Sequence, residues 1–237
     1  MTTPVLLPQA VPVSAPLGGG PASGAMLAGV LPEGGVRRGA AVSVVGDVGL
    51  LLALGAGAAG GGGWCAAVGL PELGLLAADG YGIDPQRLLL ADAPGQHWPE
   101  VVSALAGAVE VILLRPSGSV APQLAARLGA VLRRSGCVLL VAGGWPGAGL
   151  RLSVRSSRWV GLGAGHGLLA GRQAEVLAQG RGAAAQGRAV RLWLPDEHGV
   201  VRALTAQESR EWVDSAAGST ADDAAGSAMG RVGLTAV

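Results

Sequence analysis

The chain has 237 residues and a net charge of +1, from 17 basic and 16 acidic side chains. Half of the residues are hydrophobic and 14% are charged, which excludes a disordered charged polymer and allows one α/β domain with a substantial core. The near-zero charge also excludes an overall electrostatic attraction to nucleic acid or acidic lipid. All 17 basic residues are arginine, and lysine, asparagine and phenylalanine are missing, as expected of a GC-rich genome.

The first segment of the chain is punctuated by prolines, which exclude a continuous helix. We therefore predict a disordered arm, rich in Pro, Ala and Gly, over residues 1–25. No basic residue precedes Arg37, so the charged start of a signal peptide is missing. Asp47 and a run of glycines interrupt the apolar stretch 39–70, which rules out a membrane span there. These features predict a cytoplasmic protein without membrane contact.

Short apolar runs then alternate with helix-length segments. The runs predict strands at 41–45, 64–68, 87–91, 109–114 and 137–142. The segments between them predict helices near 48–58, 71–80, 98–107 and 120–135. Uninterrupted apolar strands between helices are typical of a parallel sheet covered on both faces. Cys65 and Cys137 fall in these strands, and we expect both to be buried free thiols.

The pattern changes after Gly147, where apolar and polar residues alternate. The alternation covers 150–159, 173–178 and 189–194, with a turn at Gly161–Gly167 between the first two. It predicts an antiparallel β-meander that extends one edge of the sheet, so that residues 26–204 form one α/β core.

The end of the chain is predicted to hold one short helix. Thr205 and Glu208 have the spacing of a capping box, which places this helix at 205–213. Residues 214–237 are poor in large apolar side chains, and we expect a disordered tail there.

Residues 41–55 have the layout of a nucleotide-binding P-loop: an apolar strand, a turn formed by Gly46, Asp47, Val48 and Gly49, and a helix-like run. A working loop needs a lysine and a hydroxyl where the helix begins, and leucine and alanine stand there instead. Asp47 would also repel a triphosphate. We therefore expect a vestigial phosphate loop that serves as a structural turn, with no cofactor and no ATP hydrolysis.

A second part of an ATPase is also missing. The strand 109–114 ends in Arg115-Pro116, where an active relative would carry an acidic residue that holds magnesium or orients water. The Arg115 guanidinium is expected to pair with a local carboxylate, with anion binding as the alternative.

Several segments together resemble the RecA-type core: Leu31–Gly39, the strand from Val42, Trp64–Pro71 and Gly82–Leu90. Within that superfamily the chain resembles the actinobacterial ImuA′-type accessory proteins of the SOS mutasome. The residues that carry this likeness are Trp98–Val102, Val111–Pro116, Gly144–Ala148, Leu150–Val154, Ser157–Gly163, Gly180–Gly182 and Val190–Pro195. The resemblance implies a degenerate RecA-like fold, a mostly parallel sheet flanked by helices with the C-terminal meander.

The resemblance also implies a function in DNA repair by translesion synthesis during SOS-induced mutagenesis. The protein would act without catalysis, through protein–protein contacts with an ImuB-like inactive Y-family polymerase homologue and, indirectly, an error-prone DNA polymerase. No clamp-binding peptide is present, so the sliding clamp would be reached only through a partner. The expected location is cytoplasmic, and nucleoid-associated on damage. The alternative is a RecA-like nucleotide-binding or DNA-binding ATPase with an atypical site.

Surface residues give candidates for contacts. Arg151, Arg155 and Arg158 lie near Trp159, a combination that can bind single-stranded nucleic acid weakly. Strand periodicity predicts Arg151 and Arg155 on one face and Arg158 on the other. This division favours ordinary solvent-exposed arginines over weak DNA contacts. The same two interpretations, weak DNA contact or solvent exposure, apply to Arg133 and Arg134, which are predicted on a helix.

The six tryptophans carry nearly all the aromatic packing, because the chain has a single tyrosine. Trp64 and Trp193 are predicted to face the core. Trp145, Trp212 and Val213 are candidate partner contacts, with core packing as the alternative for the tryptophans. The three histidines, at His97, His166 and His198, lack ligand spacing, so no metal site is expected.

Overall fold

The computed structural model describes residues 31, 35–60, 62–161, 170–180 and 187–213. The predicted arm at 1–25, the tail at 214–237 and most of the turn at 161–167 lie outside these residues. The chain divides into two compact units, Met1–Arg202 and Ala203–Val237. Among the described helices, none has the length and apolar character needed to cross a bilayer.

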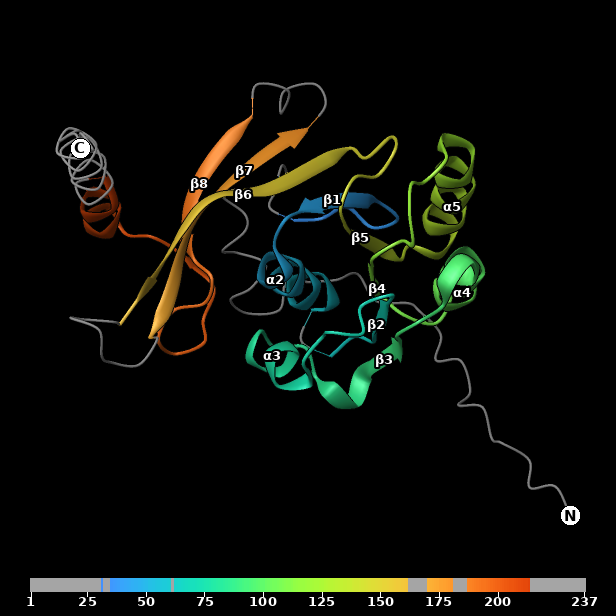
Figure 1. Ribbon diagram of the computed structural model, residues 1–237, viewed down its shortest axis with the longest axis horizontal. Coiled ribbons are helices and arrows are strands. Elements are labelled where there is room, and N and C mark those ends of the chain that lie inside the picture. Colours follow the sequence, from blue (N-terminus) through green and yellow to red (C-terminus); the bar gives the residue numbers. More distant parts are fainter. Residues whose placement is uncertain (1–30, 32–34, 61, 162–169, 181–186, 214–237) are drawn as a thin grey trace, which may run out of the picture. The chain divides into compact units, whose positions relative to one another are not determined.

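The described residues form one nine-stranded sheet with the order β3-β2-β4-β5-β1-β6-β7-β8-β9 (Figure 1). The strands are β1 (Ala41–Val45), β2 (Cys65–Val68), β3 (Leu88–Ala91), β4 (Val111–Leu114), β5 (Val138–Ala142), β6 (Leu150–Val160), β7 (Gly171–Gly180), β8 (Arg188–Trp193) and β9 (Arg202–Ala203). All pairs from β3 to β6 are parallel, and β6, β7 and β8 pair antiparallel.

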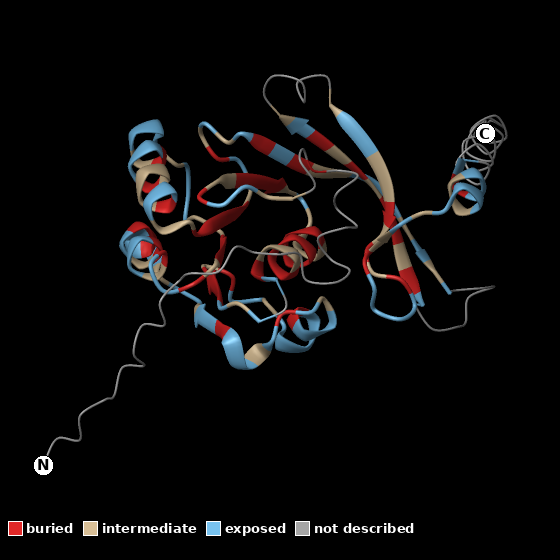
Figure 2. Cartoon of the chain, turned by 180° about the vertical axis from the view of Figure 1, so that it is seen from behind, coloured by how far each residue is buried: buried red, intermediate tan, exposed pale blue. Residues whose placement is uncertain are grey.

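Helices cover both faces of the parallel part. They are α2 (Val48–Ala59), α3 (Leu75–Gly80), α4 (Trp98–Leu105) and α5 (Pro122–Ser135), with 3-10 turns η2 (Pro85–Arg87) and η3 (Gly95–His97). Alternate strand residues serve the two sides: Leu113 packs in the cluster around α2, and Ile112 and Leu114 pack in the cluster around α4 and α5. Figure 2 shows this buried layer between exposed helix surfaces.

The mixed α/β fold and the antiparallel extension predicted from the pattern are confirmed. The strand at 41–45 agrees to the residue, because the apolar run is bounded by glycine and alanine turns. Cys65 and Cys137 are buried, each 1% exposed. The prediction that Trp64 faces the core is wrong: β2 begins one residue later, and Trp64 is 39% exposed.

A β-bulge changes the faces of β6. Arg151 lies opposite Gln179 and Arg158 opposite Gln173, while the register shifts between Val154 and Ser156. Since the two glutamines are six residues apart on one regular strand, both arginines lie on the same face, which corrects the prediction that Arg158 lies on the other. Arg155 is the extra residue of the bulge and is exposed.

The described part of the second unit contains a helix at 206–213. The Thr205 amide donates to Glu208 Oε2 (2.7 Å), and the Glu208 amide donates to Thr205 Oγ1 (3.3 Å). These are the two reciprocal bonds of the predicted capping box.

Candidate functional site: the loop between β1 and α2

The loop after β1 is shaped as a turn that opens directly onto a helix N-terminus. Gly46 has φ of 80°, a conformation that favours glycine. Asp47 then caps α2, because its Oδ1 accepts a hydrogen bond from the Leu50 amide at 2.8 Å. In a P-loop, the backbone N–H groups of the first helical turn face the phosphate. In this chain the Asp47 carboxylate lies beside those N–H groups and accepts a hydrogen bond from one of them.

The second oxygen of that carboxylate is also engaged. Arg172 Nη2, from β7, lies 2.6 Å from Asp47 Oδ2, and the two side chains are only 15% and 8% exposed. The same nitrogen donates to Ser157 Oγ at 3.1 Å, and the guanidinium carbon lies 5.9 Å from the centre of the Trp159 ring. Arg172 Nε is buried without a hydrogen-bond partner. A strand more than a hundred residues away thus supplies the cation that neutralises Asp47.

Tyr81 closes the loop from a third direction. Its hydroxyl donates to the Leu194 carbonyl at 3.3 Å, and a Cβ added at Gly49 would lie 2.5 Å from that hydroxyl. Burial, and then the charge of Asp47, raise the pKa of Tyr81 to about 12, against the opposing effect of Arg172. Gly49 therefore serves here to admit a tyrosine ring.

The positions that follow the loop face the core. Leu50 and Leu51 are fully buried, in the cluster around α2. Side chains at these places cannot reach a ligand above the loop without leaving the core. The loop, its carboxylate, the guanidinium and the phenol form a closed polar cluster that joins the parallel core to the antiparallel strands.

The other sequence-derived sites lie apart from this cluster. Arg115 pairs with Glu72 on the surface, so the expectation of a local carboxylate partner is confirmed. Arg158 Nε donates to Gln173 Oε1 at 2.7 Å, and Arg151 is exposed. Among the described residues, no three His, Cys, Asp or Glu side chains are grouped so as to hold a metal ion.

The tryptophans are arranged differently from the prediction. Trp145 and Trp212 are each 7% exposed, so these two candidate contacts present almost no indole surface, whereas Val213 is 48% exposed. Trp145 is held by an edge-to-face contact with Trp98, with ring centres 6.2 Å apart. Trp193, predicted to lie in the core, is half-buried with the Arg202 guanidinium 5.5 Å from its ring centre.

Sequence reasoning identified Asp47 but missed Arg172, Tyr81 and Ser157. Tyr81 could have been chosen as a site candidate, because it is the single tyrosine of the chain and lies between two glycines. Arg172 gave no local signal, because its role depends on how β7 pairs with β6.

The fold and the site define a mixed α/β protein. In it, the Asp47 carboxylate occupies the helix N-terminus that follows the first strand. The chain belongs to the family described as the MT3502 N-terminal domain, whose model matches residues 29–147, half of the chain. It is also 38% identical over 108 residues to the uncharacterized protein Rv3395c of Mycobacterium tuberculosis. That match covers 45% of this chain and 53% of the relative, so the chain spans about half the length of the relative.

Proposed function

We propose that this protein is a RecA-like member of the ImuA′ type that has given up nucleotide chemistry. It would act as a non-catalytic assembly protein in translesion synthesis, through contact with an ImuB-like inactive polymerase homologue. The observation that carries this proposal is the Asp47–Arg172 pair at the start of α2. Phosphate binding would require both a free helix N-terminus and a nearby cation. Here Asp47 occupies the N-terminus of α2, and Arg172 is already paired with Asp47.

The order of the elements supports the RecA-like part of the proposal. The loop follows the central strand β1, and the parallel strands run β3-β2-β4-β5-β1-β6. Open α/β sheets likewise place their ligand-binding loops at the carboxyl ends of strands. The mycobacterial relative supports an actinobacterial origin of the family.

An exposed apolar edge supports the protein-contact part of the proposal. Leu75 and Leu76 on α3 are 46% and 88% exposed, and Leu89 and Leu90 on the edge strand β3 are 38% and 46% exposed. Edge strands without charged side chains are natural sites for pairing with another chain. Exposed large apolar side chains are common at interaction surfaces, so the leucines of α3 and those of β3 are candidate contacts.

The proposal is tested by affinity capture from damage-induced cells, with the full chain and a truncation after Leu204. We expect a polymerase-like partner with the full chain. The double variant Leu76→Glu/Leu90→Glu should lose that partner, while Val200→Glu, at another exposed apolar position, should retain it. Recovery of no polymerase-like protein with either form of the chain would contradict the proposal.

A further inference from the structure

A groove lies between α5 and the segment that joins β5 to β6. The segment 143–149 joins β5 to β6 and crosses over β1, since β6 lies on the other side of β1. The Trp145 amide ties this crossing to Ser43 Oγ at 2.9 Å. Seven residues rich in glycine fill less space than a helix, and a groove of about 420 Å³ remains beside α5. We call it the α5 groove; its size is in the range of ligand and peptide sites.

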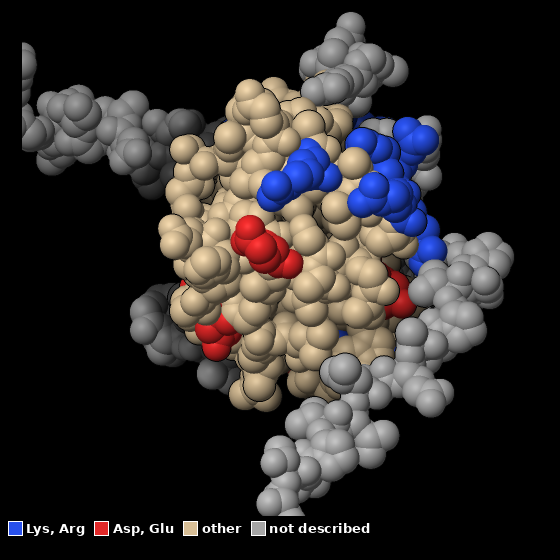
Figure 3. Space-filling model, turned by 90° about the vertical axis from the view of Figure 1, so that its right-hand side faces the viewer, with Lys and Arg blue, Asp and Glu red and all other residues tan. Residues whose placement is uncertain are grey.

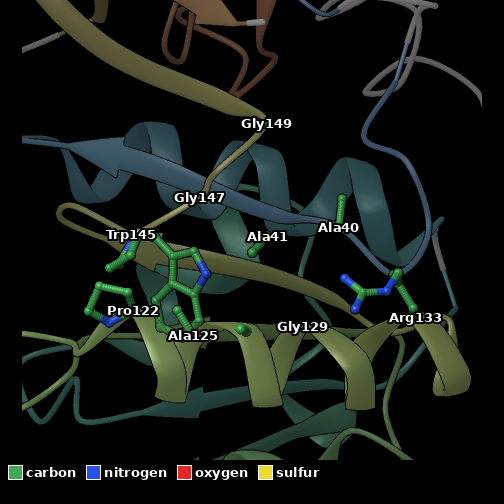
Figure 4. A pocket seen from close by; sticks show the side chains of 12 residues that line it. Ala40, Ala41, Pro122, Ala125, Gly129, Arg133, Trp145, Gly147 and Gly149 are labelled. Carbon is green, nitrogen blue, oxygen red and sulfur yellow. The ribbon is translucent and has the colours of Figure 1, made fainter.

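The walls of the α5 groove are small and apolar, with one charge. Most of the lining is glycine and alanine, as at Ala41, Ala125, Ala126, Gly129 and Gly147. Figure 4 shows Trp145 and Arg133 toward opposite ends of this lining. Arg133 is the charged residue among those that line it. The groove therefore suits small aliphatic side chains with a carboxylate at the Arg133 end.

Four further exposed arginines belong to the two segments that meet at Arg133, namely the stretch before β1 and helix α5. Arg37, Arg38, Arg127 and Arg134 are exposed, like Arg133, and none of the five forms an ion pair with a described acidic residue. The two segments are adjacent, since Gly39 packs on Arg133 and the Gly39 amide donates to the Gly136 carbonyl. Figure 3 views the molecule from the side where Figure 1 places α4 and α5, and arginines gather at the upper right of that view. The helix dipole accounts for Arg133 and Arg134 in the last turn of α5, but not for the other three.

We propose that the α5 groove binds an acidic, amphipathic segment of a partner protein. Its aliphatic side chains enter the groove, one carboxylate pairs with Arg133, and further carboxylates meet the exposed arginines of the adjoining segments. Charge complementarity selects an acidic partner, and the alanine and glycine walls select a protein segment over nucleic acid. Single-stranded nucleic acid binds on exposed aromatic rings, and the indole that lines this groove is 7% exposed and packed on Trp98. This inference rests on the proposed function, for which it supplies a second contact surface.

The test uses the full chain and fluorescence anisotropy with three labelled probes. The first is a helical peptide of about 20 residues with Glu-Ala-Ala-Leu repeats, long enough to fold alone. The second has lysine in place of glutamate, and the third is an oligothymidylate. We expect the glutamate peptide to bind at least about tenfold more tightly than the lysine peptide, and more weakly as salt is added. The oligothymidylate should not displace it.

Variants locate the binding in the α5 groove. Gly129→Leu fills it, Ala126→Glu places a carboxylate on its exposed wall, and Arg133→Glu reverses its charge. Each should weaken the glutamate peptide by about tenfold. Ala126→Glu is at an exposed position, so it keeps the test valid if Gly129→Leu fails to fold. Arg188→Glu is the matched control, since Arg188 is exposed and pairs opposite Ala178, on the α2 side of the sheet.

Equal binding of the two peptides, or equal effects of the groove variants and the control, overturns the proposal. Displacement by oligothymidylate overturns it as well and assigns the surface to nucleic acid. If capture of the polymerase-like partner succeeds while the peptide fails, only this inference is wrong. If the peptide binds as described and capture fails, only the proposed function is wrong.

Discussion

Asp47 is the residue on which the interpretation of the loop depends. Its carboxylate caps α2 with one oxygen and meets Arg172 with the other, and both side chains are largely removed from water. A buried pair of this kind contributes little when intact, because desolvation offsets the attraction, but breaking it leaves an uncompensated charge. Asp47 and Arg172 therefore depend on each other.

Arg172→Met should lower the free energy of unfolding by about 3 kcal/mol, because it leaves the Asp47 carboxylate buried without a cation. Urea denaturation measures this loss. Arg191→Met removes a more exposed pair with Glu175 and should cost less than about 1 kcal/mol. Adding Asp47→Ser to Arg172→Met removes the stranded charge, keeps a capping side chain and should restore most of the loss. Equal costs for the two arginines would refute the pairing.

Tyr81 reports on the same cluster and is the single tyrosine of the chain. Its pKa is raised to about 12 in the folded protein, above the usual value of about 10. The neutral phenol therefore contributes stability that is complete below about pH 10 and is lost as the pH rises toward about 12.

Absorbance of the phenolate should give a midpoint well above pH 10 in the folded protein, falling to about 10 in denaturant. Asp47→Asn should lower the folded midpoint, because the Asp47 charge raises this pKa. Tyr81→Phe should make stability less sensitive to alkaline pH. A folded midpoint at the denatured value would show that Tyr81 is not buried against Asp47.

At the scale of elements, apolar periodicity was sufficient for the parallel part. Strands buried on both faces, such as those in 41–45 and 109–114, are short and mostly apolar. Helices such as α4 and α5 carry polar residues as well, so the two kinds of element can be distinguished in the sequence. Two features were not visible. The bulge at Arg155 depends on the pairing of β6 with β7, and the contact of Arg172 with Asp47 depends on how the antiparallel strands lie against α2. Tertiary pairing, and not local preference, determines both.

The two buried cysteines, Cys65 in β2 and Cys137 directly before β5, give a test of this core. Burial, and then the charge of Glu110, raise the pKa of Cys65 and of Cys137 to about 12. Neither thiol should react with a disulfide reagent at about pH 8 in the folded protein, and both should react in denaturant. Rapid labelling of the folded protein would show that β2 and β5 open more readily than a central sheet should.

At the scale of the whole molecule, the described surface offers two regions for partners. One comprises the exposed leucines of α3 and of the edge strand β3, and the other is the α5 groove with Arg133. The candidate partner contacts predicted from the sequence were Trp145, Trp212 and Val213, of which the two tryptophans are buried and Val213 is exposed. Aromatic residues are common interface anchors, but in a chain without phenylalanine the tryptophans also supply nearly all of the aromatic packing. The exposed leucines of α3 and β3 were not predicted as contacts, because their exposure is not visible in the sequence and single exposed leucines are common.

The central claim is that the loop at Gly46–Gly49 no longer binds nucleotide. Isothermal titration of the full chain with a non-hydrolysable ATP analogue and magnesium tests it most directly. We expect no saturable heat at millimolar ligand, because the Asp47–Arg172 pair takes up the anion position. Saturable binding that is weakened by substitution of Gly46 or Gly49 would contradict the account.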